Sequence, residues 1–379
     1  MTMIPYVDDT IYTHALAHLE RQSKQWLSAH SQPIVFFITG SAGFIGAHIA
    51  RALKFAGYQH VVLIDDLSGG NKTNVPPGVT LNVIDCANYE AMQQTIACLP
   101  KDAYKILVHC AANAREGASQ FQPMSVTHRN LSAYVNTLTA CIQAKFNRVV
   151  LFSSMSVYGA GGFEPPFDER MPLQPEDVYA YNKHAMEGIT RVLCDVHELE
   201  YSIIRPHNCF GELQALCDKF RNVVGIFMNR IMRNEPLFIY GDGLQTRAFS
   251  YIGDSLPAFL QPILVQSLRE SDLHGLAINI GGKQQITVRH LARSVCSAMR
   301  VTEDYPIEFF DDRPREVKHA YCTTDLSVKL LAYQERNGRE HGIQRMADWA
   351  LSNGPQPWFT TDELEIVTHR VPKPWITVK

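Results

Sequence analysis

Two residues four positions apart, Tyr179 and Lys183, carry the clearest chemical signal in this chain. The run 178–187 around them predicts a helix, and residues four apart on a helix lie on one face, so the phenol and the ammonium would share one space. An ammonium beside a phenol favours the phenolate and lowers a pKa that is ordinarily about 10. Such a tyrosine can act as a general base near neutral pH. Tyr181 is a natural comparison, because Ala185 gives it no such partner. A pair of this kind alone is more often ordinary helix surface, so its sequence context decides its meaning.

A glycine-rich turn upstream of this pair predicts a dinucleotide-binding unit. Residues 33–39 are apolar, β-branched and aromatic, which is typical of a buried parallel strand, and residues 47–53 have helical periodicity. The residues between them are Gly40, Gly43, Phe44, Ile45 and Gly46. Glycines at this spacing allow a tight turn and close approach of a pyrophosphate, which binds at the helix N-terminus.

Asp65 completes this dinucleotide-binding pattern. It ends a second apolar run, 60–64, at the distance of about 20 residues from the glycines that the fingerprint requires. An acid at this point hydrogen-bonds the adenosine ribose and repels a 2′-phosphate, so NAD is favoured over NADP. The alternative is a glycine-rich turn with an Asp that caps a strand, but strand, glycines, helix, strand and acid all occur here in order.

Further motifs follow in one order along the chain, and together they resemble a known family. They are residues 83–86, 109–114, 130–131, 151–159, the Tyr179/Lys183 pair, 205–211, 240–247, 279–282 and 312–317. Over roughly residues 34–352 the chain resembles the extended short-chain dehydrogenase/reductases that act as NAD-dependent nucleotide-sugar epimerases and dehydratases, and is most similar to the UDP-glucose 4-epimerase branch. The resemblance implies an α/β fold, a doubly wound parallel sheet (Rossmann) with a smaller α+β substrate-binding domain.

The resemblance also implies NAD as cofactor and assigns roles to single residues. Asp85 and Cys86 would lie against adenine, Ala111, Ala112 and Asn130 would line the cofactor, and Lys183 would hold the nicotinamide ribose. Tyr179 would remove the proton of the sugar hydroxyl, and Ser154 would share that proton through a short hydrogen bond. Ser156 would assist or merely cap the next turn.

Substrate binding is assigned by the same resemblance to Asn208, Arg247 and Arg313, at the positions that bind the nucleotide diphosphate. Two guanidiniums suit a pyrophosphate because each presents a planar, bidentate fork. Taken alone, each arginine would more often form a surface ion pair. Two segments depart from the family pattern: residues 113–119 replace its Gln-Ala-Gly-Val-Arg-x-Ser, and residues 315–316 replace its Gly-Asp.

Met155 and Ser156 bear on the type of reaction. The related 4,6-dehydratases carry an Asp-Glu pair in this stretch, and elimination of water needs an acid and a base. A thioether and a hydroxyl supply neither, so we expect epimerisation of a UDP-hexose at C4 through a transient 4-keto sugar, in carbohydrate metabolism such as polysaccharide biosynthesis. Two alternatives stay open: another NDP-sugar oxidoreductase or decarboxylase on the same fold, and a non-catalytic NAD-binding regulator. The sugar itself, glucose, its N-acetyl form or a uronic acid, stays undetermined.

Composition limits the class of protein. The 379 residues are 46% hydrophobic and 19% charged, which is enough for a large core and two domains. A net charge of −3 gives no general attraction to nucleic acid or to an anionic membrane. The nine cysteines form no Cys-x-x-Cys pair, so we expect reduced thiols in a cytoplasmic protein, with no metal site. No apolar stretch reaches the ~18 residues that cross a bilayer, and acidic Asp8 and Asp9 argue against a secretory signal.

The expected domain organisation has four parts. Residues 1–32 form a helical extension, 33–206 the NAD-binding domain, rejoined at about 237–265, 207–352 the substrate domain, and 353–379 a tail. The extension should place Ile11, Ala15, Leu19, Trp26 and Leu27 near one helical face, docked on its own subunit or, less favoured, on a partner. The proline-rich tail should lie on the surface as extended chain. By resemblance, helices near 130–145 and 179–199 would form the interface of a homodimer.

Overall fold

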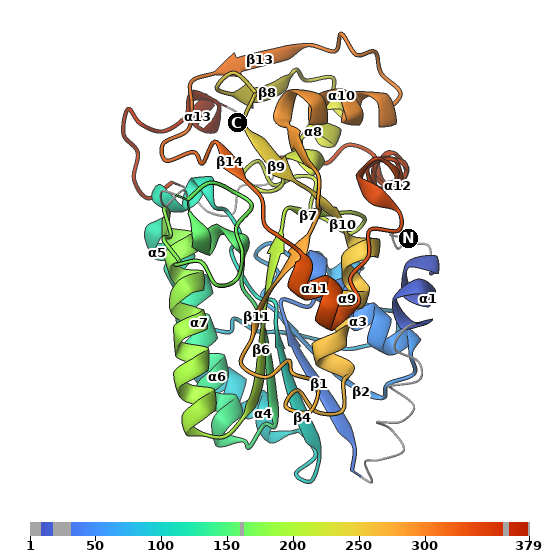
Figure 1. Cartoon of the computed structure of the whole chain (residues 1–379), viewed down its shortest axis with the longest axis vertical. Coiled ribbons are helices and arrows are strands. Elements are labelled where there is room, and N and C mark those ends of the chain that lie inside the picture. Colours follow the sequence, from blue (N-terminus) through green and yellow to red (C-terminus); the bar gives the residue numbers. More distant parts are fainter. Residues whose placement is uncertain (1–8, 18–31, 160–162, 359–363, 378–379) are drawn as a thin grey trace.

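One parallel sheet organises the larger lobe of the protein, seen in a computed structural model that describes residues 9–17, 32–159, 163–358 and 364–377 (Figure 1). Across the sheet the described strands are β11 (Ala277–Gly281), β6 (Glu200–His207), β5 (Arg148–Phe152), β4 (Tyr104–His109), β1 (Ile34–Thr39), β2 (His60–Asp65) and β3 (Leu81–Val83). All neighbouring pairs are parallel. The strand order reverses between β1 and β4, which places the loops after both strands beside one crevice.

Helices cover both faces of this sheet, as the burial of its strands requires. α3 (Phe44–Phe55) and α9 (Ile252–Leu264) lie on one face, and α4 (Tyr89–Ala97), α6 (Ala133–Gln143) and α7 (Val178–Val196) lie on the other (Figure 1). Successive strand residues supply the two cores in turn: Phe36 packs with the α3 side and Phe37 with the α4, α6 and α7 side. The predicted doubly wound sheet is confirmed.

The smaller lobe is built from short strands and three longer helices above the C-terminal edge of the sheet (Figure 1). Its strands are β7 (Cys209–Phe210) with β10 (Ser250–Tyr251), β8 (Leu237–Tyr240) with β13 (Ile307–Phe310), and β9 (Thr246–Ala248) between β12 (Gln285–Thr287) and β14 (His319–Ala320). Its helices are α8 (Val223–Met232), α10 (Val288–Ala298) and α12 (Gly338–Asn353), while α11 (Asp325–Leu331) lies beside α9. The chain returns to the large lobe through α9, which lies within the expected crossing at 237–265, and then adds β11 to the edge of the sheet.

The N-terminal extension contributes α1 (Thr10–Ala17), which packs on α3 and α9 of its own chain. Ile11 and Ala15 are buried there, while Leu19, Trp26 and Leu27 lie outside the described residues. The Tyr12 hydroxyl is 3.2 Å from His48 Nδ1, and His48 Nε2 is 2.9 Å from the carbonyl of Glu212. Burial lowers the pKa of His48 to about 4, so the ring stays neutral and can donate one of these hydrogen bonds and accept the other.

The C-terminal tail differs from the extended surface chain that its prolines predicted. A short helix, α13 (Lys373–Thr377), ends its described part, and the Trp375 side chain is only 6% exposed. Apolar packing outweighs the extended preference of the prolines, because Val371 and Trp375 join a core cluster with Ala118 and Phe121. The tail is therefore part of the fold at the crevice.

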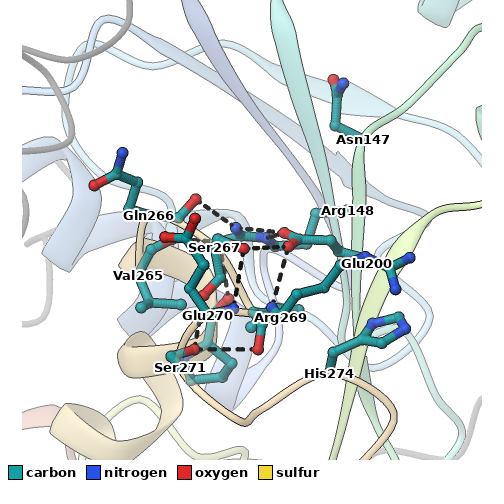
Figure 2. Close-up of polar contacts among 12 residues, drawn as sticks. Asn147, Arg148, Glu200, Val265, Gln266, Ser267, Arg269, Glu270, Ser271 and His274 are labelled. Carbon is teal, nitrogen blue, oxygen red and sulfur yellow. Dashed lines mark hydrogen bonds and ion pairs between the residues drawn. The ribbon is translucent and has the colours of Figure 1, made fainter.

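A buried ion pair ties α9 to the opposite, N-terminal edge of the sheet (Figure 2). Arg148, the first residue of β5, lies 2.7 Å from the carboxylate of Glu200, the first residue of β6. The same guanidinium donates to the carbonyls of Pro262 at 3.3 Å, Ile263 at 3.4 Å, Val265 at 2.7 Å and Gln266 at 3.0 Å. It thereby satisfies carbonyls that the end of α9 leaves without an intrahelical partner. In the part of the chain that the structure describes, no helix has the length and apolarity of a membrane-spanning segment.

Candidate active site

The glycine turn between β1 and α3 forms one end of a large cavity along the crevice of the sheet. Gly40 has a φ of +69°, and a Cβ there would lie 2.6 Å from the backbone nitrogen of Ala111. A Cβ on Gly46 would lie 2.3 Å from the carbonyl oxygen of Gly40. Only glycine fits at both positions, so the turn brings the first N–H groups of α3 to the cavity with no side chain in between.

Asp65, at the end of β2, is held by the same turn. Its carboxylate accepts hydrogen bonds from the backbone N–H groups of Ala42 at 2.9 Å and Leu67 at 2.8 Å. Burial nevertheless raises its pKa above the ordinary value, against these bonds. Asp85 and Cys86, just after β3, line the cavity beside it. Glycine turn, helix terminus and acid thus form a cradle that fits a dinucleotide such as NAD.

Tyr179 and Ser154 meet at the centre of the cavity. Asp177 caps α7 by accepting a hydrogen bond from the Ala180 N–H at 2.9 Å, which places Tyr179 in the first turn. Ser154 follows β5 in extended conformation, and its Oγ accepts from the Ser156 N–H at 3.1 Å. The Ser154 side chain lies close enough to the Tyr179 phenol to lower its pKa. A substrate hydroxyl that reached this pair would contact both a phenol and a serine.

The prediction that Lys183 lowers the pKa of the Tyr179 phenol is wrong when only groups of the protein act on that phenol. Burial raises the pKa of Tyr179 above its ordinary value, and the Ser154 side chain offsets this only in part. Lys183 lies 5.8 Å from the centroid of the Tyr179 ring, and its Nζ donates to the carbonyl of Phe152 at 2.7 Å. Burial lowers the pKa of Lys183 to about 8. Desolvation therefore outweighs the attraction that the four-residue spacing suggested.

The two arginines predicted to bind a diphosphate lie together in the smaller lobe, bridged by an acid. The Glu316 carboxylate is 2.9 Å from Arg247 Nη2 and 2.6 Å from Arg313 Nε. The departure at 315–316 explains this arrangement, because Glu316 lies between the guanidiniums while Arg315 pairs with Glu176.

Asn208, the third predicted contact, lines the same cavity. It has a φ of +42°, and its amide donates to the carbonyl of Ala248 at 2.9 Å. The amide is therefore held at the junction of the two lobes.

Two carboxyl groups in the cavity, Glu116 and Asp177, were not singled out from the sequence. The Glu116 side chain is exposed to the cavity, yet the protein around it desolvates the carboxyl enough to raise its pKa. Burial, together with the charge of Glu116, raises the pKa of Asp177 to about 7. The departure of residues 113–119 from the family pattern was the available signal for Glu116. An Asp two residues before Tyr179 gives no such signal, because it is an ordinary helix cap.

Most predicted site residues line this single cavity, which encloses about 450 Å³. The lining includes Gly40, Gly43, Phe44, Ile45, Gly46, Asp65, Asp85, Cys86, Ala111, Ala112, Ser154, Tyr179, Asn208, Arg247 and Arg313. Lys183, Asn130 and Ser156 are not among the lining residues of the described chain. Asn130 acts behind the wall, where its amide accepts from the Asn113 N–H at 2.7 Å. The Ser156 hydroxyl is buried without a partner among the described residues.

Arg221 and Trp375 also line the cavity, and neither was assigned a role of its own from the sequence. The Arg221 guanidinium lies within 2.8 Å of where a Cβ of Gly69 would be, beside the loop that follows Asp65. Trp375 comes from the C-terminal tail, and no motif pointed to it. In the described part of the chain no group of three or more His, Cys, Asp or Glu residues could hold a metal ion.

Fold and site together define a dinucleotide-binding α/β protein with a Tyr/Ser pair at its crevice. The model of the NAD dependent epimerase/dehydratase family matches residues 36–281, and the chain belongs to this family. NAD is accordingly its cofactor, as predicted.

Relatives of known name agree with the family. A putative UDP-glucose 4-epimerase of Methanocaldococcus jannaschii is 27% identical, covering 84% of this chain and 99% of its own length. The mouse dTDP-D-glucose 4,6-dehydratase is 25% identical over 83% of this chain and 88% of its own. The Thermus thermophilus UDP-glucose 4-epimerase in complex with NAD superposes with a TM-score of 0.73 at 26% identity, covering 83% of this chain and 98% of the other. Epimerases and dehydratases thus both occur among the relatives.

Proposed function

We propose that this protein is an NAD-dependent isomerase that interconverts UDP-hexoses at C4. The single observation that carries the proposal is the cavity itself. The glycine turn with Asp65, the pair Ser154 and Tyr179, and the guanidiniums of Arg247 and Arg313 all line it. A nucleotide sugar needs anion-binding groups for its diphosphate and an acid–base group at its sugar, and this one cavity brings both together.

In this proposal each residue handles the substrate in a defined way. Arg247 and Arg313 bind the diphosphate, which competes with Glu316 for their N–H donors. The proton of the C4 hydroxyl goes to the Tyr179 oxygen, and Ser154 shares it through a hydrogen bond to that hydroxyl. The glycine turn and Asp65 would hold NAD, which would supply a hydride acceptor and donor for C4 and a positive charge that favours the phenolate, as Lys183 alone does not.

Once the 4-keto sugar has formed, epimerisation requires only that it present its other face. Tyr179 then returns the proton to the new C4 oxygen. The nicotinamide-ribose contact proposed for Lys183 requires its Nζ, now bound to the Phe152 carbonyl, to extend to the cavity. The proposed reaction needs no further acid or base.

A second candidate, dehydration of the sugar across C5 and C6, is favoured by one specific observation. Met155 and Ser156 lack the acid and base of elimination, but Glu116 and Asp177 bring two carboxyl groups with raised pKa into the cavity. A carboxylic acid that keeps its proton near neutral pH can serve as a general acid. We prefer epimerisation because Tyr179 and Ser154 suffice for it.

The proposal is tested by incubating NAD-loaded protein with a panel of UDP- and dTDP-sugars and following C4 stereochemistry by NMR. Epimerisation predicts a 4-epimer of unchanged mass without net accumulation of NADH. Loss of one water mass would establish the dehydratase instead. Accumulating NADH would indicate a net oxidoreductase, and NAD binding without any turnover would indicate a regulator.

We also propose that the protein forms a homodimer through α7. Tyr181, Val192 and Val196 expose 61%, 62% and 69% of their surface on this helix. Their spacing of eleven and four residues places them on one face. A second copy of the same face would bury these side chains, as is usual for a two-fold interface.

A further inference from the structure

The C-terminal residues 364–377, which we name the C-terminal strap, are fixed to the protein at both ends. The backbone N–H groups of Glu365 and Ile366 donate to the carbonyl of Phe121 at 2.8 and 3.1 Å. The Glu365 carboxylate accepts from the N–H groups of Met124 and Ser125, both at 2.7 Å, at the start of α5 (Pro123–Thr127). At the far end Lys219 Nζ donates to the carbonyl of Trp375 at 3.2 Å. The strap is therefore anchored by specific polar contacts at both ends.

Between these anchors the strap inserts Trp375 into an aromatic wall. The indole ring meets Phe220 edge-to-face with centroids 5.1 Å apart, Phe121 at 5.9 Å and Tyr240 at 6.3 Å. Trp375 is 6% exposed and lines the cavity together with Phe220 and Tyr240. Edge-to-face pairs of this kind hold rings in defined orientations. Trp375 is thus a fixed part of the wall.

This wall adjoins the cations of the substrate half. A Cβ placed on Gly117 would lie 3.2 Å from Arg313 Nη1 and 3.5 Å from Trp375 Cη2, so the indole and the guanidinium face the same small gap. Arg313 also lies over the Tyr240 ring, with its Cζ 5.2 Å from the centroid. Flat aromatic surface beside guanidinium groups suits a nucleoside diphosphate, because the base can stack on a ring and the phosphates can pair with the guanidiniums.

The strap lies beyond residues 36–281, which match the family model. Its contribution to the cavity is therefore a feature of this chain that the family match does not supply. We infer that the C-terminal strap completes the substrate half of the cavity and that Trp375 is a binding residue for the nucleoside diphosphate part of the substrate. This inference rests on the proposed function, because it assumes that the substrate is a nucleotide sugar.

Trp375→Ala in the NAD-loaded full chain tests the inference. UDP is titrated calorimetrically, and UDP-glucose turnover is measured where wild type shows it. We expect UDP affinity to fall about tenfold or more, since stacking of a base on one aromatic ring contributes about that factor. KM should rise while kcat changes less than about threefold, because the residue binds and does not react. NAD content should stay at the wild-type level.

Ile376→Ala is the matched control, because Ile376 is the next residue of α13 and is 52% exposed. It should bind UDP as wild type does. Trp375→Phe gives a second readout: UDP should change the tryptophan fluorescence of wild type much more than that of this variant, in which Trp358 still lines the cavity. If Trp375→Ala does not fold, Glu365→Ala takes its place, since it loosens the strap at its anchor and should also weaken UDP binding.

Two results would overturn the inference in distinguishable ways. Unchanged UDP affinity in folded Trp375→Ala, with wild type binding UDP, removes the strap from substrate binding and leaves the proposed function standing. If wild type binds neither UDP nor dTDP, the proposed function fails, and the inference fails with it.

Discussion

In the proposed mechanism Tyr179 is a buried base, and its phenol gives up its proton to solvent only when a cationic group binds beside it. Burial raises the pKa of its phenol, so the protein's own groups keep the proton in place. A base of this kind works only when bound groups add positive charge at the same point. The proposed mechanism therefore couples proton removal to the presence of the charged nicotinamide.

Replacement of Tyr179 by Phe tests this role. The ring is 7% exposed and well packed, so Phe should preserve the fold and NAD binding while removing the reacting oxygen. We expect kcat to fall by a factor of roughly 10² to 10⁴, the usual contribution of a general base. Interconversion is followed by NMR and NAD content by absorbance after denaturation. Tyr181→Phe is the control, and activity retained in Tyr179→Phe would disprove the assignment.

Asp177 makes a pH dependence at the same site testable. Its pKa is raised to about 7 from an ordinary 3.8, so the folded protein binds more protons than the unfolded chain between these values. Stability contributed by this group therefore declines as pH rises through that window. The new negative charge should also repel a diphosphate, so KM should rise as pH increases through about 7.

Asp177→Asn isolates this effect, because Asn caps a helix as well as Asp does and stays uncharged. The variant should lose the rise in KM across neutral pH and gain stability on the alkaline side of the transition. Both are measured over the same pH series, by initial rates and by denaturant unfolding. A KM profile that parallels wild type would assign the titration to another group.

Single residues were predictable from the sequence where local geometry sets their role. The glycines of the turn and Asp65 belong to this kind, because the strand–turn–helix unit fixes them. The Glu316 bridge between Arg247 and Arg313 was not predictable, since it depends on side chains brought together by the tertiary fold. The direction of the Tyr179 pKa shift was predicted wrongly from Lys183, because spacing along a helix says nothing about desolvation, which raises that pKa.

Elements of the large lobe followed from hydrophobic pattern, and those of the small lobe did not. The apolar runs at 33–39 and 60–64 become β1 and β2 nearly residue for residue. Strands of two to four residues such as β7, β10 and β13 are too short for a period to appear. The strap was mispredicted because its prolines describe local preference, whereas Trp375 packs on residues more than a hundred positions away.

At the scale of elements, Arg148 is predicted to hold α9 to the sheet. Its side chain is wholly buried against Glu200, whose pKa stays below its ordinary value because the guanidinium charge outweighs burial with the help of hydrogen bonds. Arg148→Met removes the cation that pairs with Glu200 and the guanidinium donor of four carbonyls. Tyr104, Ser267 and Arg269 still donate to the acid. The free energy of unfolding should fall by roughly 3 kcal/mol. Denaturant unfolding measures this loss.

The matched control for Arg148 is a surface pair with similar geometry. Arg170 lies 2.8 Å from Asp168, but its side chain is 91% exposed. Arg170→Met should leave the unfolding midpoint unchanged, because water replaces the lost contact. Equal effects of the two substitutions would show that burial does not decide the contribution of Arg148. The ordinary UDP-hexose assay should be unaffected by either, since both lie away from the cavity.

At the scale of the whole molecule, the two lobes contribute different halves of one cavity. The sheet edge supplies the cradle with Ser154 and Tyr179, and the small lobe supplies the arginines and, with the strap, the aromatic wall. The family resemblance predicted this division but gave no place for either terminus. Both terminal segments dock on the core, α1 beside α3 and the strap beside α5.

The proposed homodimer rests on an apolar surface of α7 that the fold leaves exposed. Tyr181, Val192 and Val196 stay exposed on α7 although apolar side chains of this size gain free energy on burial. Val192→Glu combined with Val196→Glu would place like charges opposite each other across a two-fold axis, which opposes association. We expect light scattering to give twice the 42.7 kDa chain mass for wild type and the single chain mass for the double variant.

Leu351→Glu is the control for this last prediction, because Leu351 is also exposed but lies on α12 in the smaller lobe. Its mass should equal that of wild type. The α7 variant should keep its NAD and its melting temperature in the monomeric form, since the substituted side chains make few contacts within their own subunit. A monomeric wild type, or a double variant that still dimerises, would show that α7 is not the interface.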